Sequence, residues 1–272
     1  MAKRELNMQA KSPILLTIDV EECDIPLEYG ISIELDEQLR ISKEGLDRFM
    51  SLVDALEIPV TIFCTAVFAQ NHPEWIKNIH PRHELASHGF YHGKFDATTD
   101  LMASKNLLEE LSGREIQGFR MARMQQVDES EILKAGYRYH SSLNPTWIPG
   151  RYNHLDKPKH SFFEHGLWNV PASVSPDFRI PLFWLAFKNF PLSLYRYLAA
   201  RALRGNGYLN IYFHPWEFSD LGRFALPAHV KRGHGGPLLA KLESLLKGWK
   251  RDARGEFVTM QSYVNNLSDG IK

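Results

Sequence analysis

Short apolar runs alternate with longer amphipathic segments along the chain, and this alternation limits the possible folds more than any other feature. Continuous apolar or β-branched runs predict strands at 13–19, 59–65, 83–87, 116–120, 136–142, 167–173, 207–214 and 255–260. Amphipathic segments between them predict helices at 36–57, 66–79 with a break near Pro73, 98–111, 128–135, 192–204 and 235–250.

Strands that alternate with helices require parallel crossover connections within one sheet. About eight such strands in 272 residues favour a (β/α) barrel of the TIM type. An open doubly wound sheet is less favoured, because no glycine-rich phosphate-binding loop follows the first strand. The sequence shows no internal repeat, low-complexity tract or linker. We therefore predict an α/β barrel that forms one domain over residues 1–272.

The charge balance and composition argue against several classes of protein. The 32 basic and 32 acidic residues cancel, which argues against a nucleic-acid partner. No apolar run reaches the roughly 20 residues that a membrane-spanning helix needs. The polar start MAKRELNMQAKSP lacks the apolar core of a secretion signal. With only Cys23 and Cys64 present, a disulfide framework is not expected, and a cytoplasmic location fits the sequence best.

Residues with reactive side chains fall at the ends of the predicted strands. A barrel places its chemistry at the carboxyl ends of its strands. Five residues are found at or just after such ends: Asp19, His88, His92, Arg120 and His214. We therefore expect these five side chains to share one site.

The segment HELASHGFYH, residues 83–92, contains three histidines, two of which are four positions apart. On a helical turn this separation brings the imidazoles of His88 and His92 to about 5–6 Å, and both can reach one metal ion at about 2.0–2.1 Å. Gly89 indicates a turn rather than the middle of a helix. Two unrelated surface histidines are the alternative. We expect His83 to have a surface or structural role.

The candidate for a third metal ligand lies in the stretch TIDVEE. Residues two apart on a strand face the same side, so Asp19 and Glu21 are expected to project together into the barrel mouth. One carboxylate would bind metal and the other would act as a base, since a cation between them offsets their repulsion. An acidic surface loop is the alternative, because Glu22 and Asp24 extend the run.

The stretches YFHPWEF and GFRMAR supply further candidates. His214 ends an apolar strand and is either an acid or base that works near neutral pH or a core histidine. Trp216 beside it would stack on a sugar ring or fill the core. Arg120 is a permanent cation that would hold Asp19 ionised through a charge-assisted hydrogen bond or form a surface salt bridge. Arg123 is a weaker candidate of the same kind.

Taken in order, these segments resemble the five motifs of the polysaccharide deacetylase family (carbohydrate esterase family 4). Its members are metal-dependent esterases that remove N- or O-acetyl groups from chitin, peptidoglycan and xylan. LLTIDVEE resembles the first motif, HELASHGFYH the second, GFRMAR the third, LWNVPAS the fourth and YFHPWEF the fifth, over residues 14 to 218. The resemblance implies a distorted (β/α) barrel of seven or eight strands, a divalent metal and a carbohydrate substrate.

The resemblance also implies a role for each matching residue. Asp19 matches the catalytic base that activates water, and Arg120 matches the arginine that orients this base. His88 and His92 match the metal-binding pair of histidines. His214 matches the general acid that protonates the departing group.

The chain departs from the usual family pattern at three positions. Val20 stands where most members carry a second aspartate that binds the metal. The next carboxylate is Glu21, which resembles a branch with the spacing Asp-x-Glu/Asp, and Glu22 is the alternative ligand. Ala122 stands two residues after the arginine of motif three, where the family usually has a proline. His140, where relatives often carry aspartate, either joins the site as a substrate-binding residue or lies near it.

The resemblance therefore predicts a hydrolase that removes an acetyl or other acyl group from a carbohydrate, acting on carbon–nitrogen bonds other than peptide bonds. Candidate substrates are an amino-sugar polymer of a bacterial cell envelope, an oligosaccharide or a lipid-linked sugar. Two histidines and one carboxylate suit zinc, and also iron, cobalt or nickel. A catalytically inactive carbohydrate-binding protein is the alternative function. The basic, aromatic stretch 179–204 either rests on a membrane surface or forms a substrate-gating loop followed by a barrel helix.

Overall fold

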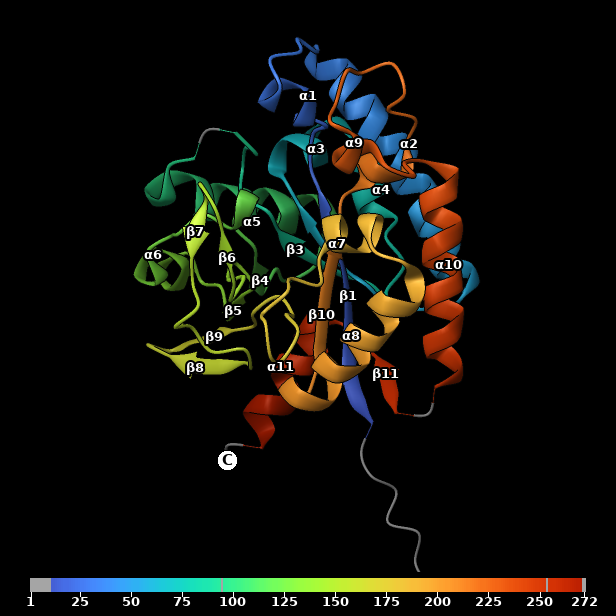
Figure 1. The fold of residues 1–272 in the computed structure, drawn as a ribbon. Helices are drawn as coiled ribbons and strands as arrows, with labels where there is room; N and C mark the ends of the chain where they lie inside the picture. The colour runs from blue at the N-terminus through green and yellow to red at the C-terminus, as the bar shows by residue number, and fades with distance from the viewer. Residues whose placement is uncertain (1–10, 94, 253, 271–272) are drawn as a thin grey trace, which may run out of the picture.

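A curled sheet of nine strands forms the centre of the computed structural model, which describes residues 11–93, 95–252 and 254–270 (Figure 1). The strand order is β10-β1-β2-β3-β4-β5-β9-β8, and β11 pairs with the start of β1. The strands are β1 (Ser12–Val20), β2 (Thr61–Cys64), β3 (Glu84–Ser87), β4 (Gly118–Phe119), β5 (Tyr139–His140), β8 (Phe162–Glu164), β9 (Leu167–Asn169), β10 (Leu209–Phe213) and β11 (Gly255–Phe257). All pairs are parallel except β8 with β9. Each predicted strand overlaps one of the parallel strands, which confirms the α/β class.

Helices connect the parallel strands and cover the outer face of the sheet (Figure 1). The predicted helices are confirmed as α2 (Leu35–Ala55), α3 (Ala66–Asn71) with α4 (Pro73–Lys77), α5 (Ala97–Ser112), α6 (Glu129–Lys134), α8 (Leu192–Asn206) and α10 (Gly236–Arg251). Pro73 causes the expected break, because it cannot continue the ladder of α3 and instead begins α4. No helix of the described residues has the length and apolar character to cross a bilayer.

Several short elements were not predicted from the sequence. They are α1 (Ile25–Glu28), α7 (Trp184–Asn189), α9 (Ala228–Lys231), α11 (Met260–Asp269), the 3-10 turns η1 (Ala122–Met124) and η2 (Pro215–Phe218), β8, and the hairpin of β6 (Trp147–Ile148) and β7 (Tyr152–Asn153). Most of them lie in the connections that follow strand carboxyl ends, and they shape the rim of the barrel.

Side chains of β1 alternate between the two faces of the sheet, as a period of two requires. The even-numbered residues 14–20 pack against the surrounding helices, whereas Leu15 belongs to an inner core. The inner core joins strand residues to residues of α11: Phe63, Ala86, Tyr139, Trp168, Val170, Tyr208, Met260, Tyr263 and Val264. α11 therefore closes the amino-terminal end of the barrel (Figure 1). Toward the other end of β1 the inner positions become polar, with Thr17 and then Asp19.

The barrel is distorted, because its sheet does not close into a continuous ladder. Among the described residues β9 and β10 form no strand pair. Instead the segment after β9 reaches β10 through Ser173, whose N–H donates to the Asn210 carbonyl at 2.9 Å and whose Oγ accepts from the Asn210 N–H at 2.8 Å. This narrow seam agrees with the distorted barrel implied by the family resemblance.

Gly45, in the middle of α2, allows a close contact between this helix and the turn that follows β10. A Cβ at this position would lie 1.9 Å from the carbonyl oxygen of Pro215. A glycine inside a helix costs about 0.5–1 kcal/mol relative to alanine, so a packing reason is expected. Its missing side chain lets η2 lie directly on α2, which fixes the backbone beside His214.

Candidate active site and metal centre

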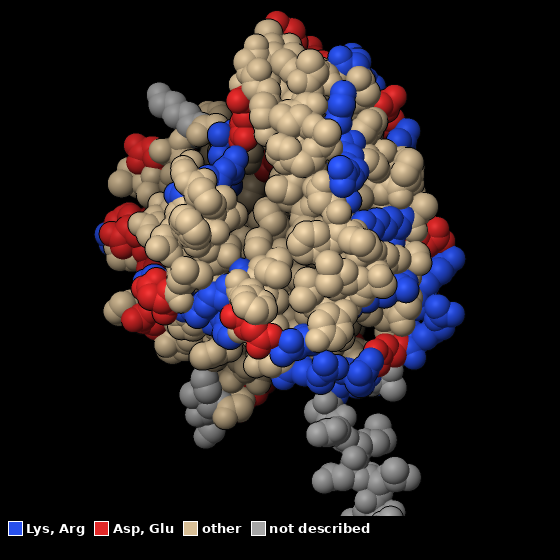
Figure 2. Space-filling view, in the orientation of Figure 1, with Lys and Arg blue, Asp and Glu red and all other residues tan. Residues whose placement is uncertain are grey.

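A pocket of about 260 Å³ opens at the carboxyl ends of the strands. Figure 2 shows the hollow between the part of the molecule with α1 and α9 and the part with the β6–β7 hairpin. Four of the five residues predicted to share a site line this pocket: Asp19, His88, His92 and His214. Arg120, the fifth, is buried behind Asp19 and contacts it. The barrel topology thus brings together side chains that are far apart in the sequence.

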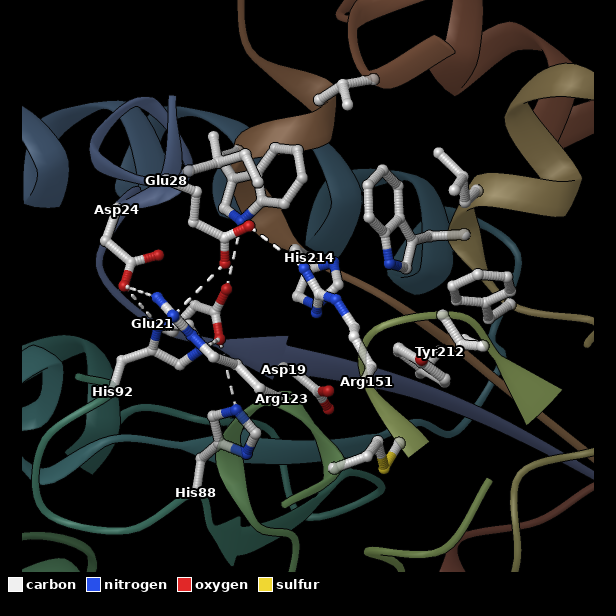
Figure 3. A pocket seen from close by; sticks show the side chains of 18 of the residues that line it. Asp19, Glu21, Asp24, Glu28, His88, His92, Arg123, Arg151, Tyr212 and His214 are labelled. Atoms are coloured by element: carbon white, nitrogen blue, oxygen red, sulfur yellow. Dashed lines mark hydrogen bonds and ion pairs between the residues drawn. The ribbon is translucent and has the colours of Figure 1, made fainter. Parts of the chain in front are cut away.

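Glu21 lies between the two histidines that follow β3 (Figure 3). Its Oε2 is 3.2 Å from His88 Nε2 and 2.7 Å from His92 Nε2, and no side chain of the three is more than 8% exposed. The three ligand atoms lie within 4.8 Å of one another. The histidines occupy an irregular loop in which Gly89 has a φ of +84°, as the glycine indicated, rather than a helical turn.

These donors fit a divalent cation. Tetrahedral ligands at about 2.0–2.1 Å from a metal are about 3.3 Å apart, which is close to the spacing of Glu21 Oε2 and His88 Nε2. Asp24 Oδ2 is 2.7 Å from His92 Nδ1, and a carboxylate behind a ligating imidazole fixes the orientation of the ring. Trp216 Nε1 donates to Glu21 Oε1 at 3.2 Å, which leaves Oε2 for the histidines. Imidazole and carboxylate ligands suit zinc, iron, cobalt or nickel.

Glu22, the alternative third ligand, makes a different contact. Its Oε1 accepts a hydrogen bond from Thr65 Oγ1 at 3.3 Å. Its Oε2 is buried and has no hydrogen-bond partner among the described residues. Burial raises the pKa of Glu22 to about 7. The geometry favours Glu21 over Glu22 as the residue that faces the two histidines.

The charge state of the cluster follows from its partners. Burial alone would raise the pKa of Glu21, but the charges of His92 and His214 and hydrogen bonds from His88 and His92 hold this pKa well below its usual value. Burial would lower the pKa of His92, but Glu21 and Asp24 raise it to about 10. Without a cation, a proton on His92 therefore balances the charge of Glu21, and a divalent ion would replace that proton.

Asp19 is held by a fully buried arginine. Arg120 donates from Nη1 to Asp19 Oδ1 and to Thr17 Oγ1, both at 2.7 Å. It also donates from Nε to the Ser141 carbonyl at 3.1 Å and from Nη2 to Ser141 Oγ at 2.9 Å. Its guanidinium lies 4.2 Å from the centroid of the Phe63 ring. The ion pair of Arg120 and Asp19 is therefore buried and is not a surface salt bridge. It fixes the orientation of Asp19 at the pocket.

His214 is fixed by a buried ion pair. Its backbone N–H donates to Glu217 Oε1 at 2.8 Å, and its Nδ1 is 3.1 Å from the same oxygen. Glu217 Oε2 is 3.5 Å from Lys188 Nζ, and both of these side chains are fully buried. Burial would lower the pKa of His214, but the charges of Glu21 and Glu217 raise it. With Nδ1 bound to Glu217, Nε2 is the nitrogen available for a substrate in the pocket.

The two residues proposed to contact substrate are placed differently. Trp216 lines the pocket but is only 2% exposed, because its ring stacks on His214 at a centroid distance of 5.1 Å. Trp216 therefore packs in the wall of the pocket and orients Glu21, and it does not expose a ring face on which a sugar could stack. His140 does not line this pocket. It lies in a second pocket, where its Nε2 is 3.5 Å from Glu129 Oε1, so it is near the candidate site and outside it.

Some residues of the site were not identified from the sequence. Asp24, interpreted as part of an acidic run, also pairs with Arg123 at 2.7 Å, and both line the pocket. Glu217 follows His214 at the spacing of a capping box, a signal that could have identified it. No comparable signal marks Lys188, which comes from α7 and meets Glu217 only in the folded chain.

The basic, aromatic stretch 179–204 forms one wall of the pocket and then α8. Phe183, Trp184 and Leu185, at the start of α7, line the pocket. Lys188, one of the basic residues that suggested a membrane surface, is buried. This arrangement agrees with the alternative of a loop beside the substrate followed by a barrel helix, and contact with a membrane stays a prediction.

Comparisons with known proteins support the fold. No protein-family model and no curated protein sequence matches the chain. A structure from Mycobacterium smegmatis, assigned as a polysaccharide deacetylase, aligns with 96% of this chain and 92% of its own, at 17% identity and a TM-score of 0.68. A structure from Pseudomonas aeruginosa PAO1, with the same assignment, aligns with 92% of this chain and 88% of its own, at 15% identity and a TM-score of 0.60. The structure of Puue allantoinase aligns with 92% of this chain and 88% of its own, at 19% identity and a TM-score of 0.60.

The chain therefore has the (β/α) barrel fold of the polysaccharide deacetylases. Because these identities lie between 15% and 19%, the similarity concerns the fold alone. One of these structures is named an allantoinase, so the fold does not decide the substrate and the function depends on the site residues.

Proposed function

We propose that this chain is a metal-dependent hydrolase of the polysaccharide deacetylase family, which removes an acetyl or other acyl group from a carbohydrate. The observation that carries the proposal is the convergence of Glu21, His88 and His92 in a pocket that Asp19 and His214 also line. The assigned deacetylases among the similar structures support a substrate with an acetyl group. We propose zinc as the metal, held by Glu21 and the two imidazoles. A divalent cation there would polarise the acyl carbonyl and lower the pKa of a bound water.

The residues around this position supply the proton transfers. Asp19 would accept a proton from water as the water oxygen forms a bond to the acyl carbon. Arg120 keeps Asp19 oriented during this step through the 2.7 Å hydrogen bond. His214 would donate a proton to the sugar nitrogen or oxygen as its bond to the acyl carbon breaks. Glu217 holds the His214 ring for this donation. The products are the free acid and the deacylated sugar.

Substitution of the proposed base tests this function. Asp19→Asn is expected to retain the metal and to lower acetate release from acetylated chito-oligosaccharides by about 10²–10⁴-fold, the usual contribution of a general base. Asp47→Asn, on the exposed surface of α2, is the matched control and is expected to change neither quantity. Metal content is measured by elemental analysis and acetate by an enzymatic assay. A fully active, metal-loaded Asp19→Asn protein would remove Asp19 from the scheme.

Two further measurements separate this proposal from its alternatives. His88→Ala is expected to lower metal content, and unchanged content would exclude the proposed centre. Allantoin is tested beside the acetylated sugars, and hydrolysis of allantoin alone would contradict the carbohydrate substrate. A metal-loaded protein that binds acetylated sugars and releases no acid would instead be a carbohydrate-binding protein without turnover. If the stretch 179–204 contacts membranes, which would favour a lipid-linked sugar, the protein will float with anionic liposomes.

A further inference from the structure

A second pocket, of about 570 Å³, lies next to the candidate active site, and Met124 lines both. It is formed by α6, the carboxyl ends of β5 and β9, and the hairpin of β8 and β9, which gather on one side of the molecule (Figure 1). The proposed deacylation does not use any residue of this pocket. Its lining includes five titratable side chains, Glu129, His140, His154, Lys157 and Glu164. The turn of the β8–β9 hairpin adds His165, which lies beside Glu129.

Three of these side chains already have the spacing of metal ligands. One ligand atom from each of Glu129, Glu164 and His165 lies within 4.8 Å of the other two. Glu129 Oε2 is 3.6 Å from His165 Nδ1. Among the described residues, neither carboxylate forms an ion pair with a lysine or arginine. Glu129 has the imidazoles of His140 and His165 as its ion-pair partners, which are groups that can also act as metal ligands.

His140 provides an independent observation that points to a ligand. The residue is only 6% exposed, and neither of its ring nitrogens has a hydrogen-bond partner among the described residues. A buried imidazole that makes no hydrogen bond is unfavourable, so such a group usually contacts a bound ligand or a water. Its Nε2 is 3.5 Å from Glu129 Oε1, which aims the ring at the carboxylate cluster.

The surrounding backbone and side chains hold the cluster in place. Asn169 Nδ2 donates to Glu129 Oε1 at 2.8 Å, in the manner of a group that orients a metal-binding carboxylate. His165 has a φ of +50° and Gly166 a φ of +88°. Two successive residues of positive φ form the tightest class of hairpin turn, and this turn carries Glu164 and His165 toward α6. A non-glycine residue in the left-handed region is uncommon, so the surrounding structure must favour it.

We propose that Glu129, His140, Glu164 and His165 form a second site for a divalent transition-metal ion such as Zn²⁺ or Co²⁺. Imidazole with carboxylate is the donor set of these ions, whereas Ca²⁺ and Mg²⁺ prefer oxygen ligands alone. An ion here ties the β8–β9 hairpin to α6 and to the end of β5, which makes the wall of the second pocket rigid. The site does not depend on the proposed deacylation, and its metal is separate from the one held by Glu21.

Metal stoichiometry tests the second site. The purified protein is stripped with a chelator and dialysed against micromolar Zn²⁺, and bound metal per chain is measured by elemental analysis. We expect two ions for the unmodified chain and one for the double variant Glu129→Gln/His165→Ala. Glu131→Gln, on the same helix and paired with Lys134, is the matched control and is expected to keep two. Millimolar Mg²⁺ is expected not to displace either ion.

Two outcomes would overturn the second site. One is a single ion in the unmodified chain that disappears in His88→Ala. The other is two ions in Glu129→Gln/His165→Ala. Circular dichroism of each variant reports whether it is folded, and if the double variant is unfolded, His140→Ala in its place is expected to bind one ion. Acetate release tests the deacylation proposal, and the number of bound ions tests the second site. A protein that releases no acetate can still bind two ions, so the two proposals fail separately.

Discussion

The buried ion pair of Arg120 and Asp19 allows a test of the site that needs no substrate. Arg120→Met keeps much of the side-chain volume and removes every hydrogen bond that the guanidinium makes. Asp19, which is 3% exposed, would then keep its carboxylate in a buried place without a cation. Breaking a buried pair by removing one partner costs about 3–5 kcal/mol, because the remaining charge is uncompensated. We expect Arg120→Met to lower the free energy of unfolding by about this amount.

The double variant Asp19→Asn/Arg120→Met separates the charge from the packing. Once the carboxylate is also neutral, no unpaired charge is left, so the double variant should be more stable than Arg120→Met alone. Residues in direct contact show coupling free energies of about 0.5–3 kcal/mol, and a fully buried pair at 2.7 Å should lie at the upper end. Urea unfolding of the four proteins in the presence of a chelator, followed by circular dichroism, gives the coupling free energy.

Arg40→Met is the control for the loss of an arginine on the surface. Arg40 lies on α2, its side chain is 58% exposed, and it pairs with Glu37 at 2.6 Å. Exposed pairs contribute about 0.2–1 kcal/mol, so this variant should unfold at nearly the same urea concentration as the parent. Equal losses in Arg40→Met and Arg120→Met, or strictly additive effects of the Asp19 and Arg120 changes, would refute the argument that the buried charge pair organises the site.

Three further substitutions test other parts of the structure. Glu217→Gln is expected to lower kcat by about 10–100-fold and to move the alkaline limb of the kcat profile to lower pH, because a charge that raises the pKa of His214 is lost; an unchanged profile would contradict this. His83 is buried, accepts from the N–H of Val60 at 3.2 Å and has a pKa lowered by burial. His83→Gln should therefore lower the free energy of unfolding by about 1–2 kcal/mol above pH 6.5, as measured by urea unfolding. This difference should shrink as the pH falls below 6.5, because the parent then loses the stability that its neutral imidazole contributes. Gly45→Ala should cost about 1–3 kcal/mol despite its higher helix propensity, since a Cβ there overlaps backbone.

The sequence was sufficient to predict the elements whose signal is local. β1 is mostly apolar and carries Asp19 next to its last residue, so its position follows from the apolar run and the inward direction of Asp19 from a period of two. The strand predicted at 255–260 shows where local reasoning stops. The strand ends at Phe257, and α11 begins at Met260 after Thr259, whose side chain accepts from the Ser262 N–H at 3.2 Å. This N-cap is present in the sequence, but a short apolar run before it suggested a longer strand.

Elements that depend on distant partners were not predictable in the same way. β8 has no apolar alternation of its own, and it is a strand because its backbone pairs with β9. Lys188 shows the same limit for the site. In the sequence it is one of several basic residues on an amphipathic stretch, but in the fold its ammonium lies between Glu217 and the carbonyl of Val230, at 3.5 and 2.8 Å. Only the tertiary structure distinguishes a buried counter-ion from an exposed one.

The two carboxylates of β1 and its end differ in their partners, and this difference divides their roles. Asp19 has a permanent cation of its own in Arg120, which is its ion-pair partner at 2.7 Å. Glu21 contacts only titratable or neutral groups among the described residues, chiefly His88 and His92. Its charge is balanced either by a proton on an imidazole or by a bound cation, and only the cation leaves both imidazoles neutral and able to act as ligands. Asp19, which has a fixed counter-charge in Arg120, is therefore suited to move protons. Glu21, which has none, is suited to hold the metal.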